Sequence, residues 1–167
     1  MRVLGIDPGT VVMGYGVIEG DDKPQLVACG AIKCPARHKT PERLGYLYQE
    51  LLKIISRHKP DVIAIETPFV AENVKSALAI GKAQAVAILA ATTHKIPICE
   101  YPPAQVKQTV AGYGTSTKEQ VQEMVRLQLH LNQAPQPTDA ADALAVALCH
   151  IQASHLNSLL NQKIRGA

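Results

Sequence analysis

Alternating and continuous apolar positions in the first part of the chain predict strands. Residues 3–7 form a short apolar run that ends at a DPGT turn, and residues 14–19 and 26–32 form two more such runs. The turn-forming segment 20–22 separates the second run from the third. We therefore expect three strands arranged as an antiparallel meander.

A helix and a buried strand come next. Thr40 is a plausible N-cap with Pro41 at the first helical position, and apolar residues then recur at helical spacing as far as Ile55. Pro60 ends this stretch, and residues 62–66 (VIAIE) read as a buried strand. Because a helix leads into it, this strand should lie parallel to the first.

The second half of the chain alternates between helix and strand patterns. Residues 73–91 are small or apolar on nearly every side, which predicts a helix buried in the fold or placed at a subunit interface. Residues 96–101 predict a short strand, and Pro102-Pro103 opens a helix that continues to about residue 110.

Two more helices are expected near the C-terminus. Ser116 and Glu119 have the spacing of a capping box before an amphipathic run. A last helix begins at about Thr138 and continues past His155. The order predicts an α/β fold with a mixed five-stranded sheet flanked by helices, and the absence of repeats and linkers predicts one domain over residues 1–167.

Composition limits the class of protein. The chain has 47% hydrophobic and 19% charged residues, which is typical of a soluble globular protein. Its apolar runs are interrupted short of the roughly 20 residues of a membrane span, so no membrane partner is expected. We find no signal-peptide pattern and no paired cysteine spacing, so we expect a cytoplasmic protein with reduced thiols.

The net charge of +3 is weak support for nucleic-acid binding by itself. If four of the 14 acids bind metal, however, ten acids remain against 17 lysines and arginines. A moderately basic total can therefore hide a surface that faces DNA.

Candidate chemistry begins with acids that end strands. Asp7 and Glu66 each follow an apolar strand, where an unpaired carboxylate costs several kcal/mol unless it binds a partner or a metal. The alternative for either residue is a loop acid that caps a helix or forms a surface ion pair. Asp139 and Asp142 lie on one face of the first turn of a helix, and the alternative for this pair is simple stabilisation of that helix.

Taken together, these four carboxylates suit a hard cation. Oxygen ligands without histidine or cysteine favour Mg²⁺ or Mn²⁺ over Zn²⁺. Two such ions, about 4 Å apart, can activate water and stabilise a leaving oxygen in phosphodiester hydrolysis. The residues alone therefore predict a two-metal phosphoryl-transfer site, with Mg²⁺ as cofactor and Mn²⁺ as a substitute.

Four motifs in order carry a resemblance to a known family. They are GIDPGT at residues 5–10, IETPF at 65–69, AQVKQTVAGYGTSTK at 104–118 and DAADALA at 139–145. Together they resemble the RuvC family of Holliday-junction resolvases over residues 1–153, whereas residues 154–167 carry no family signal. The resemblance implies a ribonuclease H-like fold and a homodimer that makes symmetric nicks in four-way DNA junctions, leaving 5′-phosphate and 3′-hydroxyl ends. A RuvA–RuvB type of branch-migration complex is a further implied partner.

The resemblance also assigns roles to single residues. It implies that the metal-binding catalytic acids are Asp7, Glu66, Asp139 and Asp142. Lys107 and Lys118 match basic positions that approach the scissile strand, and Phe69 matches an aromatic residue that stacks on bases at the opened junction. The alternatives are solvated helix lysines and a core phenylalanine. The chain departs from the family at residues 81–85, where GKAQA replaces the frequent GQARG and moves the basic side chain to another side of the helix.

Other functions stay open at this point. A different ribonuclease H-like nuclease acting on RNA or single strands would use the same acids. The GIDPGT motif also resembles the phosphate loop of actin-like ATPases, but these need two such lobes and the chain has room for one. A non-enzymatic junction-binding module would be expected to lack at least one of the acids.

Overall fold

The structure is a computed structural model that describes residues 1–67 and 74–165, with side chains described up to residue 159. One five-stranded sheet with the order β3-β2-β1-β4-β5 forms its centre. The strands are β1 (Arg2–Asp7), β2 (Val12–Glu19), β3 (Gln25–Lys33), β4 (Val62–Glu66) and β5 (Ile98–Tyr101). The first three form an antiparallel meander, and β4 and β5 run parallel to β1. The predicted α/β fold with a mixed five-stranded sheet is confirmed.

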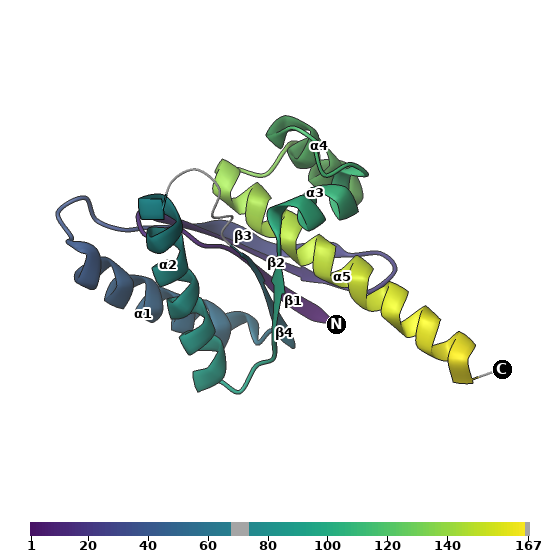
Figure 1. Cartoon of the computed structure of the whole chain (residues 1–167), viewed down its shortest axis with the longest axis horizontal. Coiled ribbons are helices and arrows are strands. Elements are labelled where there is room, and N and C mark those ends of the chain that lie inside the picture. The colour runs from purple at the N-terminus through teal and green to yellow at the C-terminus, as the bar shows by residue number, and fades with distance from the viewer. Residues whose placement is uncertain (68–73, 166–167) are drawn as a thin grey trace.

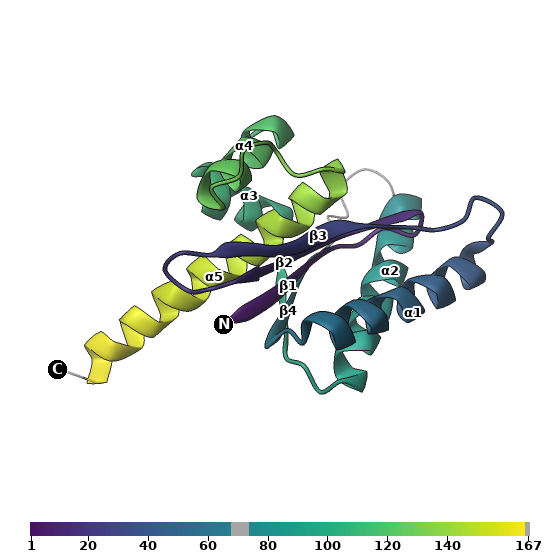
Figure 2. The same cartoon turned by 180° about the vertical axis from the view of Figure 1, so that it is seen from behind.

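Helices cover both faces of the sheet (Figures 1 and 2). On one face, α1 (Thr40–His58) and α2 (Val74–Thr93) pack over a core that includes Leu4, Ile6 and Ile63. On the other face lies the long α5 (Thr138–Arg165), with α3 (Pro103–Ala111) and α4 (Lys118–Gln128) packed against it. Alternate residues of each strand therefore supply two separate cores.

Glycines in the sheet allow α5 to approach β1 and β2 closely. A Cβ atom on Gly5 would lie 2.0 Å from the Ala143 carbonyl oxygen, and one on Gly14 would lie 2.0 Å from the Asp139 carbonyl oxygen. A side chain at either position would push the helix away from the sheet. The N-terminal end of α5, which carries Asp139 and Asp142, is therefore held directly over the end of β1, where Asp7 pairs with Gly14.

Two predicted helix caps are wrong by one residue. The N-cap of α1 is Lys39 rather than Thr40, and its backbone N–H donates to the Glu42 carboxylate. The N-cap of α4 is Thr117 rather than Ser116, because the Thr117 hydroxyl accepts from the backbone N–H of Gln120 and the Gln120 side chain closes the capping box. Ser116 is instead a buried residue before the cap.

Helix α2 buries one side and exposes another. Its small residues Ala83 and Ala87 pack against the core, whereas Leu78 and Leu89 are 62% and 56% exposed. Within the described part of the chain, α2 is the one helix that could cross a membrane by length and composition. That is weak support for a span, because the core helix of a soluble protein meets the same criterion.

Candidate active site

Neighbouring elements bring the predicted acids to one edge of the sheet. Strands β1 and β4 are parallel, with Ile6 opposite Ile65, so Asp7 and Glu66 follow at the same edge. The first two turns of α5 add Asp139 and Asp142 from one face of the sheet. The parallel pairing of strands that lie far apart in the sequence thus creates a cluster of carboxyl groups.

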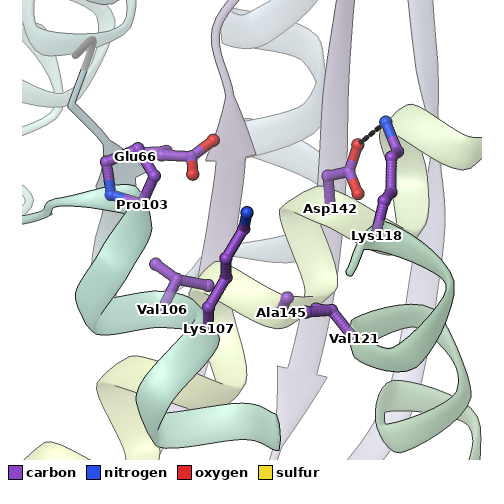
Figure 3. Close-up of a pocket in the computed structure, with 8 residues that line it drawn as sticks. All are labelled: Glu66, Pro103, Val106, Lys107, Lys118, Val121, Asp142 and Ala145. Atoms are coloured by element: carbon purple, nitrogen blue, oxygen red, sulfur yellow. Dashed lines mark ion pairs between the residues drawn. The ribbon is translucent and has the colours of Figure 1, made fainter. Parts of the chain in front are cut away.

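A cavity of about 200 Å³ opens beside these acids (Figure 3). Glu66 and Asp142 lie on opposite sides of it, and Lys107 of α3 and Lys118 of α4 point toward it from their helices. Its other lining residues are Pro103, Val106, Val121 and Ala145. The cavity therefore combines carboxylates, two lysines and an apolar floor, which is the chemistry needed to hold a phosphodiester near cations.

Burial and mutual repulsion make the two strand-end acids hard to ionise. Burial, followed by the charges of Asp142 and Asp139, raises the pKa of Asp7 to about 6. Burial, followed by the charges of Asp7 and Asp142, raises the pKa of Glu66 to about 7. Both acids thus sit in a region with excess negative charge, where a bound cation would lower both pKa values.

The lysines partly offset this negative charge. The Lys118 Nζ atom lies 2.5 Å from Asp142 Oδ2, and this contact raises the pKa of Lys118. Burial raises the pKa of Asp142 although the contact with Lys118 opposes this shift. The positive charge of Lys107 lowers the pKa of Glu66, against the larger effect of burial. Lysine charge is therefore directed at the acids from two different helices.

The donor set fits a hard divalent cation. All four acids offer oxygen ligands. A bound cation would reduce the electrostatic repulsion among their carboxylates. Among the described residues, however, no three acidic, histidine or cysteine side chains already stand together as metal ligands. The ammonium of Lys118 instead holds the Asp142 carboxylate.

Most of the residues singled out in the sequence meet at this site. The four acids interact electrostatically, and Lys107 and Lys118 line the same cavity. Phe69 falls outside the described residues. Sequence reasoning missed Gln122, whose side chain lies close enough to Asp142 to lower the pKa of that carboxyl group, against the larger effect of burial. Its signal was its position one helical turn after Lys118, on the same face of α4.

The departure at residues 81–85 has a local explanation. Gln84 stands where many family members carry arginine, and its Nε2 atom donates to Glu100 of β5 across 3.0 Å. Lys82 is exposed on α2 instead. The basic side chain of this segment, Lys82, therefore takes no part in the contact between Gln84 and Glu100.

A mixed sheet of this order, with acids from β1, β4 and α5 meeting at one edge, defines a metal-dependent nuclease of the ribonuclease H-like class. The sequence model of the family described as "Crossover junction endodeoxyribonuclease RuvC" matches residues 3–150. The chain belongs to this family. A relative from Dehalococcoides mccartyi is 53% identical, covering 97% of this chain and 98% of its own length. One from Chloroflexus aggregans is 54% identical, covering 90% and 92%.

Solved structures agree with this assignment. The structure described as "T. thermophilus RuvC in complex with Holliday junction substrate" is 35% identical, with a TM-score of 0.88 over 94% of this chain and 96% of that one. The yeast mitochondrial Holliday junction resolvase Ydc2 has a TM-score of 0.69 at 16% identity, covering 99% of this chain and 86% of that one, and this supports the fold alone. The predicted ribonuclease H-like fold and the predicted family are both confirmed.

Proposed function

We propose that the protein resolves Holliday junctions in the cytoplasm during recombination and repair, by paired symmetric nicks that leave 5′-phosphate and 3′-hydroxyl ends. The observation that carries this proposal is the single cavity that joins Glu66, Asp142, Lys107 and Lys118. Family membership and the similarity to a resolvase bound to junction DNA support the choice of substrate. A branch-migration complex of the RuvA–RuvB type is a further proposed partner, supported by family membership alone.

In this proposal the four acids have one shared task. Asp7, Glu66, Asp139 and Asp142 hold two Mg²⁺ ions, for which Mn²⁺ can substitute. Bound there, the ions supply Lewis-acid activation of water and of the leaving oxygen. Lys107 and Lys118 orient the scissile strand by contacts with its phosphates, because both ammonium groups reach the cavity. Phe69 is proposed to stack on a base at the opened junction.

Metal binding should depend on pH in a way that thermal unfolding can detect. The raised pKa values of Asp7 and Glu66, about 6 and about 7, mean that the metal-free folded protein binds more protons than the unfolded chain between about pH 4 and 7. The contribution of these two groups to the free energy of unfolding is therefore present at low pH and is lost as the pH rises through this window. Mg²⁺ should raise Tm more at about pH 8 than at about pH 5.

Asp7→Asn provides the comparison for this measurement, because it removes one of the two titrating groups. We expect the variant to show a smaller difference between the Mg²⁺ effects at the two pH values. An equal rise in Tm at both values in the wild-type protein would mean that these acids do not bind the ion.

A homodimer would match the two-fold symmetry of the junction, with one site for each nick. The exposed side of α2 offers a surface for a second copy. Val74, Leu78 and Leu89 lie along it at helical spacing, each more than half exposed. Lys82, four residues after Leu78, lies on the same exposed side. Large apolar side chains exposed on one side of a helix are typical of an interface, and we propose that two α2 helices pack together here.

Leu78→Glu combined with Leu89→Glu should separate the two copies. Each change would bury an unpaired charge in the dimer, so the dimer dissociation constant should rise by about 100-fold or more. Sedimentation should then show a folded monomer that nicks one strand at a time. Leu156→Glu is the matched control, because Leu156 is 57% exposed on α5 and should leave the dimer intact. A double variant that stays dimeric with paired nicks would place the interface elsewhere.

A ribonuclease H-like nuclease acting on RNA or single strands is the alternative, because it would use the same acids. The two are separated by incubating the protein and Mg²⁺ with an immobile four-way junction, a linear duplex of the same sequence and an RNA–DNA hybrid. We expect nicks in the junction alone. Faster cleavage of the hybrid or of single strands would favour the alternative.

A further inference from the structure

The ion pair between Lys118 and Asp142 links two groups that the proposed function uses separately. Lys118 is assigned to a phosphate and Asp142 to a metal ion, yet in the structure they hold each other, with Nζ 2.5 Å from Oδ2. Lys107 lines the same cavity but forms no salt bridge with any residue in the described ranges. The two lysines are therefore not equivalent, because Lys118 is paired with a carboxylate and Lys107, among the described residues, is not.

We propose that Lys118 is a built-in counter-ion that competes with the divalent cation for Asp142. In the free protein its ammonium stabilises the carboxylate that would otherwise add to the repulsion among the acids. A dication and an ammonium on the same carboxyl group repel each other, so Lys118 has to leave when the ion binds. This inference rests on the proposed function in taking Asp142 as a metal ligand.

Local structure allows Lys118 to leave at low cost. Its side chain is 54% exposed, so the ion pair is partly screened by solvent. Lys118 is the first residue of α4, where the helix dipole repels a positive charge. The helix start does not depend on it, because Thr117 and Gln120 form the cap. Movement of the ammonium would therefore leave α4 in place.

A DNA phosphate gives the released ammonium a new partner. Binding of the scissile strand would draw Lys118 from Asp142 and make that carboxylate available, and binding of the cation would release Lys118 toward the phosphate. Each ligand then strengthens the other, because coupling between two binding sites is reciprocal. Until a substrate strand binds, the ion pair would therefore keep Asp142 from serving as a metal ligand.

The test is a Mn²⁺ titration of the full chain without DNA, by calorimetry or by the electron paramagnetic resonance of free Mn²⁺, at about pH 8. Lys118→Met keeps the length of the side chain and removes the competitor. We expect its dissociation constant for Mn²⁺ to fall by about three- to tenfold. Lys107→Met removes the same charge from the same cavity and should change the constant by less than about twofold. Lys118→Arg keeps a competing cation and should stay near the wild-type value.

The controls separate the outcomes. Equal tightening in the Lys118→Met and Lys107→Met proteins would assign the effect to general charge removal and overturn the proposal. An unchanged or weaker affinity in Lys118→Met would overturn it as well. Failure of the wild-type protein to nick junctions would contradict the proposed function instead, and the DNA-free titration would still decide the competition between Lys118 and the cation.

Discussion

Asp7→Asn is expected to lower the rate of junction nicking by about a thousandfold or more while junction binding stays equal or becomes tighter. The change keeps the side-chain volume but removes a charge from the group of acids in which Asp7 interacts with Glu66, Asp139 and Asp142. Loss of a metal ligand removes the activation of water and of the leaving oxygen. Binding should survive because repulsion of the DNA phosphates falls.

Single-turnover nicking and equilibrium binding of the same labelled junction measure these two effects separately. Asp22→Asn is the matched control, because Asp22 is 82% exposed and its contact is His155, away from the cavity. This control should behave as the wild-type protein. Near-normal nicking by Asp7→Asn would remove Asp7 from the catalytic assignment. Loss of both folding and binding would show that the carboxylate is structural.

The second large effect is expected when a side chain is added at Gly14. Gly14→Ala would place a Cβ atom 2.0 Å from the Asp139 carbonyl oxygen, so α5 or β2 has to shift. We expect a loss of about 3 kcal/mol in the free energy of unfolding, which corresponds to a fall in Tm of roughly 6–12 °C. Nicking should fall by about a hundredfold, because a displacement of about 1 Å moves the acids of α5.

Gly45→Ala tests whether this effect belongs to the close approach rather than to glycine replacement in general. Gly45 lies on α1 with nothing within 4 Å of an added Cβ atom. Alanine should stabilise that helix by about 0.5–1 kcal/mol. Calorimetric melting and the nicking assay on both variants check the pair. Wild-type stability and activity in Gly14→Ala would contradict the proposed contact between β2 and α5.

The sequence predicted the fold well because each strand ended at a clear signal. The turn after Asp7, the turn at residues 20–22 and the proline before β4 all lie outside the strands in the structure. The helix caps were harder to predict because Ser116-Thr117 and Lys39-Thr40 each offer two neighbouring candidates. Capping depends on which backbone N–H meets which side chain, and sequence spacing alone does not decide between adjacent residues.

The candidate site was also predicted only in part. The acids were predicted from their positions at strand and helix ends, and the structure brings them to one edge. The ion pair of Lys118 with Asp142 could not be predicted, because these residues lie on separate helices whose packing joins them. Which side of α2 faces outward could not be predicted either, because residues 73–91 are small or apolar on nearly every side. The alanines at 83 and 87 are buried in the protomer, and the larger Leu78 and Leu89 point outward.

The central claim is that two symmetric nicks resolve a four-way junction. The most direct measurement uses a junction with a short homologous core, with each strand labelled in turn, and maps the cuts made by the wild-type protein with Mg²⁺. The account predicts nicks at matching positions in two opposed strands of the same molecule, and products that a ligase seals without further treatment. Cuts at unmatched positions, ends that cannot be sealed, or equal cutting of the linear duplex would contradict it.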